Sequence, residues 1–234
     1  MTCRHSQDYI VASGKGTNEM QQIGESAVSD HRPLETTSSA EGAKARTEAY
    51  GLLAGLLRNP PSAELLQLLA DRADGPGQAQ RPTDLQAAWT RLSEAARSAD
   101  PAAVDDEFHK LFIGLGRGEL LPYGSYYLTG FLMDKPLAAL RDELSRLGIQ
   151  RADGVSEPED HAAAICETMV LLADPEHGIP LPGQQAFFSE YVGAWLPRFF
   201  SDVQGAKNAD FYRSVGRLGE AFMEFERVWL SLPE

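Results

Sequence analysis

Apolar side chains recur at helical spacing along the chain from residue 46 onward. Steps of three and four residues place side chains on one face of an α-helix, whereas a half-buried strand needs alternating apolar and polar residues. No stretch alternates convincingly. The clearest helical stripe lies near the C-terminus and consists of Phe211, Val215, Leu218, Phe222, Phe225 and Trp229. The chain is therefore expected to be all-α, a single bundle of about eight or more helices joined by short loops.

Short motifs predict where several of these helices begin and end. Thr83 and Gln86 have the spacing of a capping box, and so do Ser156 and Glu159. In such a box the two side chains bond backbone N–H groups in the first turn of a helix. Gly148 follows an apolar stripe and suits the left-handed conformation that ends many helices. These signals predict helices that begin after Thr83 and after Ser156, and a helix that ends at Gly148.

The composition changes near residue 45. Residues 1–45 hold few large apolar side chains and are dominated by Ser, Thr, Gly, Gln and Glu. Such a segment cannot offset its loss of conformational entropy by burial, so we expect residues 1–45 to be a disordered N-terminal extension. Residues 46–234 are long enough for one all-helical domain with a proper core.

Charge and residue usage exclude several functional classes. The net charge of -13 argues against a nucleic-acid partner, because neutralising phosphates needs clustered Lys and Arg. No run of about eighteen apolar residues exists, so no membrane insertion is expected. The chain start lacks the features of a secretory signal, and Cys3 and Cys166 cannot form a disulfide framework, so a cytoplasmic protein is expected. No zinc-ligand spacing or Glu-x-x-His pair occurs, so no metal and no other cofactor is expected.

Two segments about thirty residues apart carry the candidate binding site. The first, residues 108–127, is an apolar helix end that runs into a loop rich in glycine and aromatic residues, and the second, residues 156–161, is acidic and ends in a histidine. Together they suggest a groove for an apolar, positively charged peptide. For Phe108, Leu111 and Phe112, core packing and a groove wall both remain open, with Leu111 the more natural core residue.

The second segment is expected to start a helix. At 100° per residue, Asp160 lies opposite the apolar stripe of that helix and His161 lies at its edge, so Asp160 is expected to face a ligand. The alternative is that Glu157, Glu159 and Asp160 only complement the helix dipole and that His161 is structural. The glycines of residues 114–118 invite a phosphate-binding interpretation, but they follow a helix rather than a strand, which favours a simple connector.

The two segments resemble the signatures of the TorD/DmsD family of chaperones. The matching residues are Phe108-His-Lys-Leu111-Phe112, Gly114, Pro122-Tyr123-Gly124-Ser125-Tyr126-Tyr127 and Glu157-Pro158-Glu159-Asp160-His161. The resemblance covers roughly residues 46–232. It implies a signal-peptide-binding site made of Phe108, Leu111, Phe112, Pro122, Tyr123, Gly124, Ser125, Tyr127, Glu157, Glu159, Asp160 and His161.

The resemblance also implies a function. Proteins of this family bind the twin-arginine signal peptide of a molybdenum-cofactor oxidoreductase, of the formate dehydrogenase or S-/N-oxide reductase type, and hold it for cofactor insertion before export. The chain would then be a non-catalytic cytoplasmic chaperone whose partners are that peptide and the catalytic subunit. A homodimer could form by domain swapping through the loop Gly148–Ser156. A helical adaptor for another protein helix, or a nucleotide-binding protein, are the alternatives.

Overall fold

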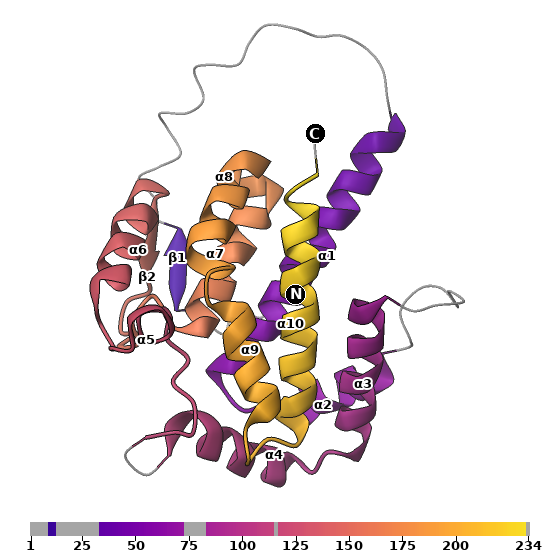
Figure 1. Ribbon diagram of the computed structural model, residues 1–234. Coiled ribbons are helices and arrows are strands. Elements are labelled where there is room, and N and C mark those ends of the chain that lie inside the picture. Colours follow the sequence, from indigo (N-terminus) through magenta and orange to yellow (C-terminus); the bar gives the residue numbers. More distant parts are fainter. Residues whose placement is uncertain (1–8, 13–32, 73–82, 115–116, 233–234) are drawn as a thin grey trace, which may run out of the picture.

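The computed structural model describes residues 9–12, 33–72, 83–114 and 117–232, and within them the chain is almost entirely helical (Figure 1). The α-helices are α1 (Pro33–Arg58), α2 (Ala63–Asp71), α3 (Asp84–Ser98), α4 (Pro101–Phe108), α5 (Gly124–Thr129), α6 (Lys135–Arg146), α7 (Ala162–Ala173), α8 (Leu181–Phe187), α9 (Leu196–Gly205) and α10 (Phe211–Trp229). The strands are β1 (Ile10–Ala12) and β2 (Ile149–Arg151). Two π-helical turns, His109–Ile113 and Phe188–Val192, continue α4 and α8, and a 3-10 turn, Pro175–His177, follows α7. The predicted all-α bundle is confirmed.

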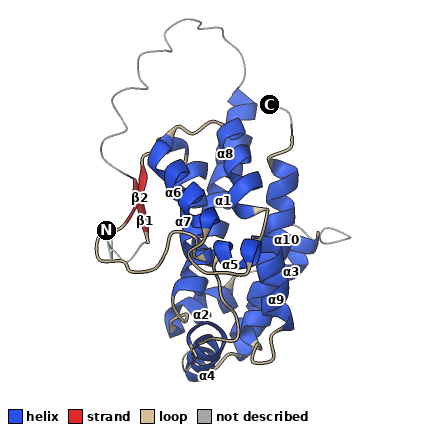
Figure 2. Cartoon of the chain, turned by 60° about the vertical axis from the view of Figure 1, so that its left-hand side comes forward, coloured by secondary structure: helices blue, strands red, loops and turns tan. Residues whose placement is uncertain are grey.

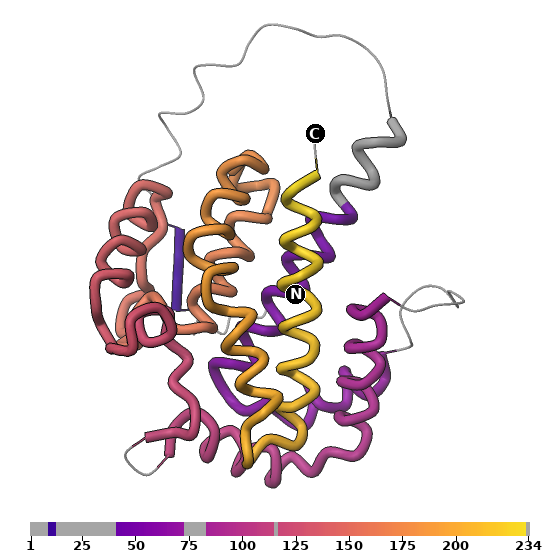
Figure 3. Tube along the Cα trace, in the orientation of Figure 1, coloured from indigo at the N-terminus to yellow at the C-terminus, as the bar shows by residue number. Residues whose placement is uncertain are grey.

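Helix α10 is a long amphipathic helix that packs through its apolar face. Helices α9 and α3 pack along it, α1 packs against α7, and α2 packs on α3 (Figure 1). The chain passes from α3 to the opposite side of the molecule through α4, and there α5 and α6 follow (Figure 3). The β1–β2 ribbon lies beside α6 and α7 at the edge of the bundle (Figure 2). This course brings the two candidate segments to the same side of the molecule.

Small residues let α9 and α10 approach closely. A Cβ atom added at Gly219 would lie 2.3 Å from the Phe200 ring, and one at Gly216 would lie 2.8 Å from the Phe200 carbonyl oxygen. Phe200 is fully buried. Any larger residue at either glycine would push the two helices apart, because a packed core cannot absorb the added volume.

A buried ion pair joins α1 to α10. The Arg46 guanidinium donates from Nε and Nη2 to the two carboxylate oxygens of Glu226, at 2.7 and 3.0 Å. Its Nη1 donates to the Gln184 side-chain oxygen on α8 at 2.8 Å, and the Tyr50 hydroxyl donates to Glu226 at 3.1 Å. Arg46 and Glu226 are 3% and 0% exposed. Each charge depends on the other, since removal of one partner leaves an uncompensated charge in the core.

A carboxylate on α4 caps the start of α10. Glu107 Oε1 accepts from the backbone N–H groups of Asp210 and Tyr212, at 2.8 and 2.7 Å, and Oε2 accepts from that of Phe211 at 3.1 Å. These N–H groups have no partner within their own helix. Burial raises the pKa of Glu107, although the three hydrogen bonds act in the opposite direction. The cap fixes α4, and hence the first candidate segment, to α10.

The N-terminal region differs from expectation. We expected residues 1–45 to be disordered, and 1–8 and 13–32 of them lie outside the described residues. Within the described part, Ile10–Ala12 form strand β1, which pairs antiparallel with β2, and α1 begins at Pro33. Ile10 is 3% exposed. The composition argument missed this strand because it detects only segments rich in large apolar residues. The strand has one buried isoleucine and is held mainly by backbone hydrogen bonds. The domain boundary at residue 46 would fall inside α1.

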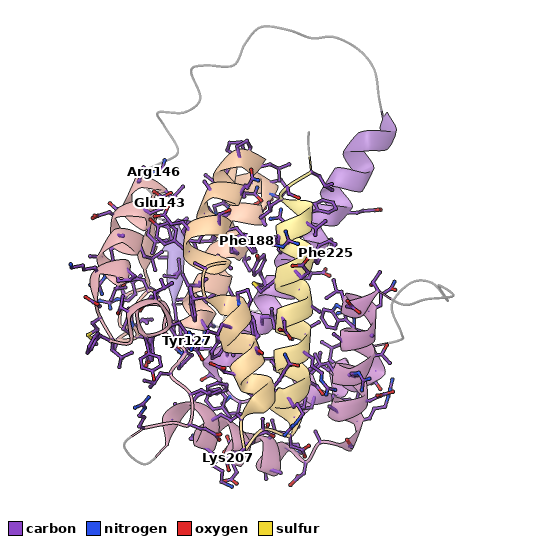
Figure 4. All side chains as sticks on the ribbon, in the orientation of Figure 1. Tyr127, Glu143, Arg146, Phe188, Lys207 and Phe225 are labelled. Atoms are coloured by element: carbon purple, nitrogen blue, oxygen red, sulfur yellow. The ribbon has the colours of Figure 1, made fainter. Side chains whose placement is uncertain are left out.

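Two predicted helix ends are confirmed and one is wrong. The Thr83–Gln86 capping box is present, with both reciprocal hydrogen bonds, and Gly148 has a left-handed φ of 68°. The box predicted at Ser156 does not form, because α7 begins only at Ala162, with His161 as its N-cap. On α10 the predicted stripe is buried except near its end, where Phe225 stacks between Phe222 and Trp229 and is 38% exposed (Figure 4).

We predict that Glu107→Gln lowers the free energy of unfolding by about 1–3 kcal/mol, because its amide would turn a donor toward a buried N–H. Glu119→Gln is the matched control. Glu119 also accepts backbone N–H groups, from Lys207 and Asn208, but at the exposed surface. Urea denaturation of both variants measures the difference. Equal losses for the two variants would show that the buried cap is not special.

Candidate functional site

The two candidate segments are joined through their backbones. The Gly124 N–H donates to the Asp160 carbonyl oxygen at 2.9 Å, and the Ala162 N–H donates to the Pro122 carbonyl oxygen at 2.8 Å. Tyr123 and its opposite residue, His161, form an isolated antiparallel bridge. The bridge holds the start of α5 beside the start of α7, so segments far apart in the sequence form one surface.

A cavity of about 530 Å³ lies beside this bridge. Its wall comes from the π-helical turn after α4 and the loop that follows, from the turn after α5, and from the segment before α7. The lining residues are Phe112, Ile113, Arg117, Gly118, Leu121, Tyr123, Leu132, Met133, Ser156, Glu157, Pro158 and Asp160. Ligand sites in proteins commonly have this volume. The lining includes four of the predicted site residues, namely Phe112, Tyr123, Glu157 and Asp160.

Asp160 is a buried acid in the lining of this cavity. Its side chain does not lie on α7, as the 100° periodicity predicted, but in the turn before it, and the residue is only 3% exposed. Oδ2 accepts from the Ser125 N–H at 2.8 Å. Oδ1 is buried and has no hydrogen-bond donor in the part of the chain that the structure describes. A buried acceptor without a donor is unfavourable, so this oxygen is suited to receive a donor from a ligand.

Tyr123 and Glu157 form one wall of the cavity. The Tyr123 hydroxyl donates to Glu157 Oε2 at 2.7 Å. Burial raises the pKa of Tyr123, and the Glu157 carboxylate raises it further, so the phenol stays protonated and keeps donating this bond. Glu157 is half-buried, and its other carboxylate oxygen remains available to a ligand.

His161 supports this wall from behind. Its Nδ1 accepts from the Ala163 N–H at 3.1 Å and so caps α7. Its ring packs edge to face on Tyr123, with ring centroids 5.2 Å apart. Burial lowers the pKa of His161 to about 3, and the charge of Arg58 acts in the same direction. The imidazole is therefore neutral and serves as a cap and packing partner, which is the structural role that the sequence analysis left open.

An exposed apolar rim flanks the cavity. It consists of Ile113, Leu128, Phe131, Leu132 and Met133, of which Phe131 and Met133 are 71% and 74% exposed. Met133 has a φ of 55°, and its N–H donates to the Ser125 hydroxyl oxygen at 3.2 Å. Ser125 thus connects the rim to Asp160, since its own N–H bonds that carboxylate. Contiguous exposed apolar side chains commonly mark an interaction site.

Other predicted site residues lie elsewhere. Phe108 and Leu111 are in the core, where Phe108 packs on Tyr212. Glu159 is turned away from the cavity and pairs with Arg141 at 2.8 Å. Tyr127 bonds Asp202 from α9 through its hydroxyl and packs on Trp195 (Figure 4). Pro122 and Gly124 are buried and contribute their backbone to the bridge.

The sequence analysis missed the rim. Its signal was the run Phe131-Leu132-Met133, which stands between Gly130 and the start of α6 and belongs to no helical stripe. Large apolar residues in a short connection between helices have no core to enter. Gly118, which the sequence analysis considered only as part of the glycine loop, is needed because a Cβ there would lie 2.7 Å from the Leu111 carbonyl oxygen.

A second, larger cavity of about 730 Å³ lies where α6, β2 and the start of α8 meet. Its lining carries three arginines, Arg141, Arg146 and Arg151, against one acid, Glu159. Arg146 is paired with Glu143 at the end of α6 (Figure 4). This positive lining does not suit a positively charged peptide. The Asp160 cavity carries two acids, Glu157 and Asp160, and one guanidinium, Arg117, and is the better candidate.

Neither a metal site nor a membrane span is found. Among the described residues, no group of three or more His, Cys, Asp or Glu side chains could hold a metal ion. No described helix is long and apolar enough to cross a membrane.

The described residues form an all-helical protein with a candidate binding cavity beside the bridge between α5 and α7. A family model described as "Nitrate reductase delta subunit" matches residues 78–201. The Chaperone protein TorD of Vibrio cholerae is 30% identical over 175 residues, which are 71% of this chain and 79% of the relative. That of Aliivibrio fischeri is 25% identical over 226 residues, which are 92% of this chain and 99% of the relative.

A solved structure shares the fold. A protein from Archaeoglobus fulgidus, described as a redox enzyme maturation protein, superposes with a TM-score of 0.52 at 18% identity and covers 86% of this chain and 99% of its own. The chain belongs to the TorD/DmsD family of maturation chaperones, which are not enzymes.

The His161 environment predicts a specific pH dependence. An unfolded histidine titrates near pH 6.5, so between about pH 6.5 and 3 the unfolded chain binds a proton that the folded chain does not. The contribution of His161 to stability is therefore complete above about pH 6.5 and is lost as the pH falls toward 3. We predict that, between about pH 7 and 5, the parent loses about 2 kcal/mol more stability than His161→Asn, which can keep the N-cap without titrating.

Denaturant unfolding at the two pH values measures this difference, because the other titrating groups are the same in both proteins. If the parent and His161→Asn lose stability equally, His161 is not held neutral in the folded protein.

Proposed function

We propose that this chaperone binds the twin-arginine signal peptide of a molybdenum-cofactor oxidoreductase in the Asp160 cavity. It would hold the peptide in the cytoplasm while the catalytic subunit receives its cofactor, before export. The observation that carries the proposal is that Asp160 belongs to the cavity lining and that its Oδ1 is buried and lacks a donor in the described chain. A guanidinium supplies several N–H donors and stays protonated at any physiological pH.

Both the net charge of the chain and the charges in the cavity lining favour a positively charged partner. The whole chain carries a net charge of -13, which raises the rate at which a cationic peptide meets it. At the cavity, Glu157 and Asp160 outweigh Arg117, whose guanidinium is turned over the Tyr126 ring and bonded to its hydroxyl. Both acids belong to the cavity lining, which suits two adjacent arginines.

The apolar part of the signal peptide matches the rim. Twin-arginine signals carry an apolar stretch after the arginines, and the rim offers Phe131, Leu132 and Met133 beside the acids. Full burial of one such side chain contributes about 1.5–3 kcal/mol. A hydrogen bond to a charged, buried group contributes about 1.5–3 kcal/mol, whereas an exposed ion pair contributes only about 0.2–1 kcal/mol. Both the rim and Asp160 therefore contribute to affinity, and Glu157 contributes mainly to encounter.

The proposed client is a molybdenum-cofactor oxidoreductase, and the cavity is equally compatible with the signal peptide of a formate dehydrogenase or of an S-/N-oxide reductase. The proposed partners are the signal peptide and the catalytic subunit that carries it. Domain swapping through Gly148–Ser156 remains a prediction, and it requires β2, which lies in that segment, to exchange its partner strand.

We predict that Asp160→Asn weakens binding of a synthetic twin-arginine signal peptide about tenfold or more, since it replaces the free oxygen by an amide donor. The variant has the same shape and can still accept from the Ser125 N–H. A second peptide, in which both arginines are glutamines, should bind less tightly to the parent, and Asp160→Asn should not weaken it further. Calorimetric titration of both peptides against both proteins gives this double-mutant cycle.

The matched control is Glu159→Gln, which removes the neighbouring acid of the same motif. Glu159 is paired with Arg141 outside the cavity, so its loss should leave peptide affinity unchanged. If both peptides bind equally to the parent, the cavity does not recognise arginines and the chain acts as an adaptor for apolar helices. If Glu159→Gln and Asp160→Asn weaken binding equally, the acids act only through net charge.

We predict that Met133→Asn weakens the same peptide without lowering stability. Asparagine accepts a left-handed backbone, so the φ of 55° at this position is no obstacle. The side chain is 74% exposed, and its replacement leaves no cavity. Thermal unfolding should match the parent, while the peptide dissociation constant rises. Unchanged affinity would exclude Met133 from the contact surface.

A further inference from the structure

The N-terminal strand is attached at specific points behind the peptide cavity. The Tyr9 and Ile10 N–H groups both donate to Glu167 Oε2 on α7, at 2.6 and 3.1 Å. The Ala152 N–H donates to the Tyr9 carbonyl oxygen at 2.8 Å, and this bond extends the β1–β2 ladder. Arg58 on α1 forms an ion pair with Glu167. A buried carboxylate therefore fixes the backbone of this strand, and the position of Tyr9 follows.

The Tyr9 ring packs against the second candidate segment. It meets the His161 ring edge to face, with centroids 5.5 Å apart and planes at 85°. The Arg58 guanidinium lies over the Tyr9 ring, 5.0 Å from the ring centroid. His161 in turn contacts Tyr123, whose hydroxyl bonds Glu157. A continuous series of contacts thus leads from the N-terminal strand to the cavity wall.

Tyr9 does not line the cavity itself. It packs edge to face on the His161 ring, and His161 is only 6% exposed. Without the Tyr9 ring, water could reach His161, and the histidine ring would lose the contact that sets its tilt. Tyr123 packs on that ring, so the wall that carries Glu157 would no longer be held in one position.

We propose that Tyr9 is a positioning residue for the peptide cavity: it holds His161 against Tyr123 and thereby fixes the wall formed by Tyr123 and Glu157. This inference deepens the proposed function and rests on it for its effect on affinity. Side chains that orient a binding wall from behind commonly affect affinity without contacting the ligand. Tyr9, which lies in the segment that the composition predicted to be disordered, then supports the site.

The test uses the full chain with Tyr9→Ala, Tyr9→Phe and Ile10→Ala. Ile10→Ala is the matched control, because it weakens the packing of the same strand without touching the His161 ring. Two quantities are measured: the NMR titration of the His161 ring, and the dissociation constant of the synthetic twin-arginine signal peptide. Circular dichroism checks the fold, and Tyr9→Leu replaces Tyr9→Ala if the alanine variant does not fold.

We expect Tyr9→Ala to move the His161 pKa toward its ordinary value of about 6.5 and to weaken the peptide about tenfold. Tyr9→Phe should retain parent behaviour in both measurements, and Ile10→Ala should retain the His161 titration. If Tyr9→Ala leaves the titration unchanged, or changes it while the peptide binds as tightly as before, the inference is wrong. If the parent binds no twin-arginine peptide, the proposed function fails, and the His161 titration alone decides whether Tyr9 holds the wall.

Discussion

The short backbone bridge between Pro122–Gly124 and Asp160–Ala162 is the interaction on which the site depends. Two backbone hydrogen bonds and the bond from the Ser125 N–H to the Asp160 carboxylate bring the start of α5 and the start of α7 together. Tyr123 and Asp160 of the cavity wall lie in the bridged segments, and Glu157 is bonded to Tyr123.

The bridge explains a division of roles among polar residues of one motif. Glu159 is paired with Arg141, and His161 is buried, neutral and caps α7. Glu157 is held by the Tyr123 hydroxyl at the cavity wall. Asp160, which belongs to the cavity lining, uses one oxygen for structure, and its other oxygen is buried without a donor in the described chain. A buried carboxylate oxygen without a donor favours a charged donor strongly, because a hydrogen bond is electrostatically stronger in the protein interior than in water.

Periodicity and capping predicted much of the fold, and long-range pairing set the limits. The stripe of α10, the Thr83 cap and the Gly148 helix end depend on residues near in sequence, so they could be predicted. The Ser156 capping box failed because the segment before Ala162 forms a turn, closed by the bond from the His161 N–H to the Pro158 carbonyl oxygen, and then bridges to Tyr123. The same bridge moved Asp160 off the helix, so a helical angle could not give its direction. Strand β1 was invisible because its partner, β2, and its anchor, Glu167, lie far along the chain.

The most direct test is a crystal structure of the protein bound to a synthetic twin-arginine signal peptide. The account predicts an arginine guanidinium within hydrogen-bond distance of Asp160 Oδ1 and the apolar stretch packed on Leu132 and Met133. A peptide seated instead in the arginine-lined cavity beside Arg146 and β2, with Asp160 Oδ1 still lacking a donor, would contradict it.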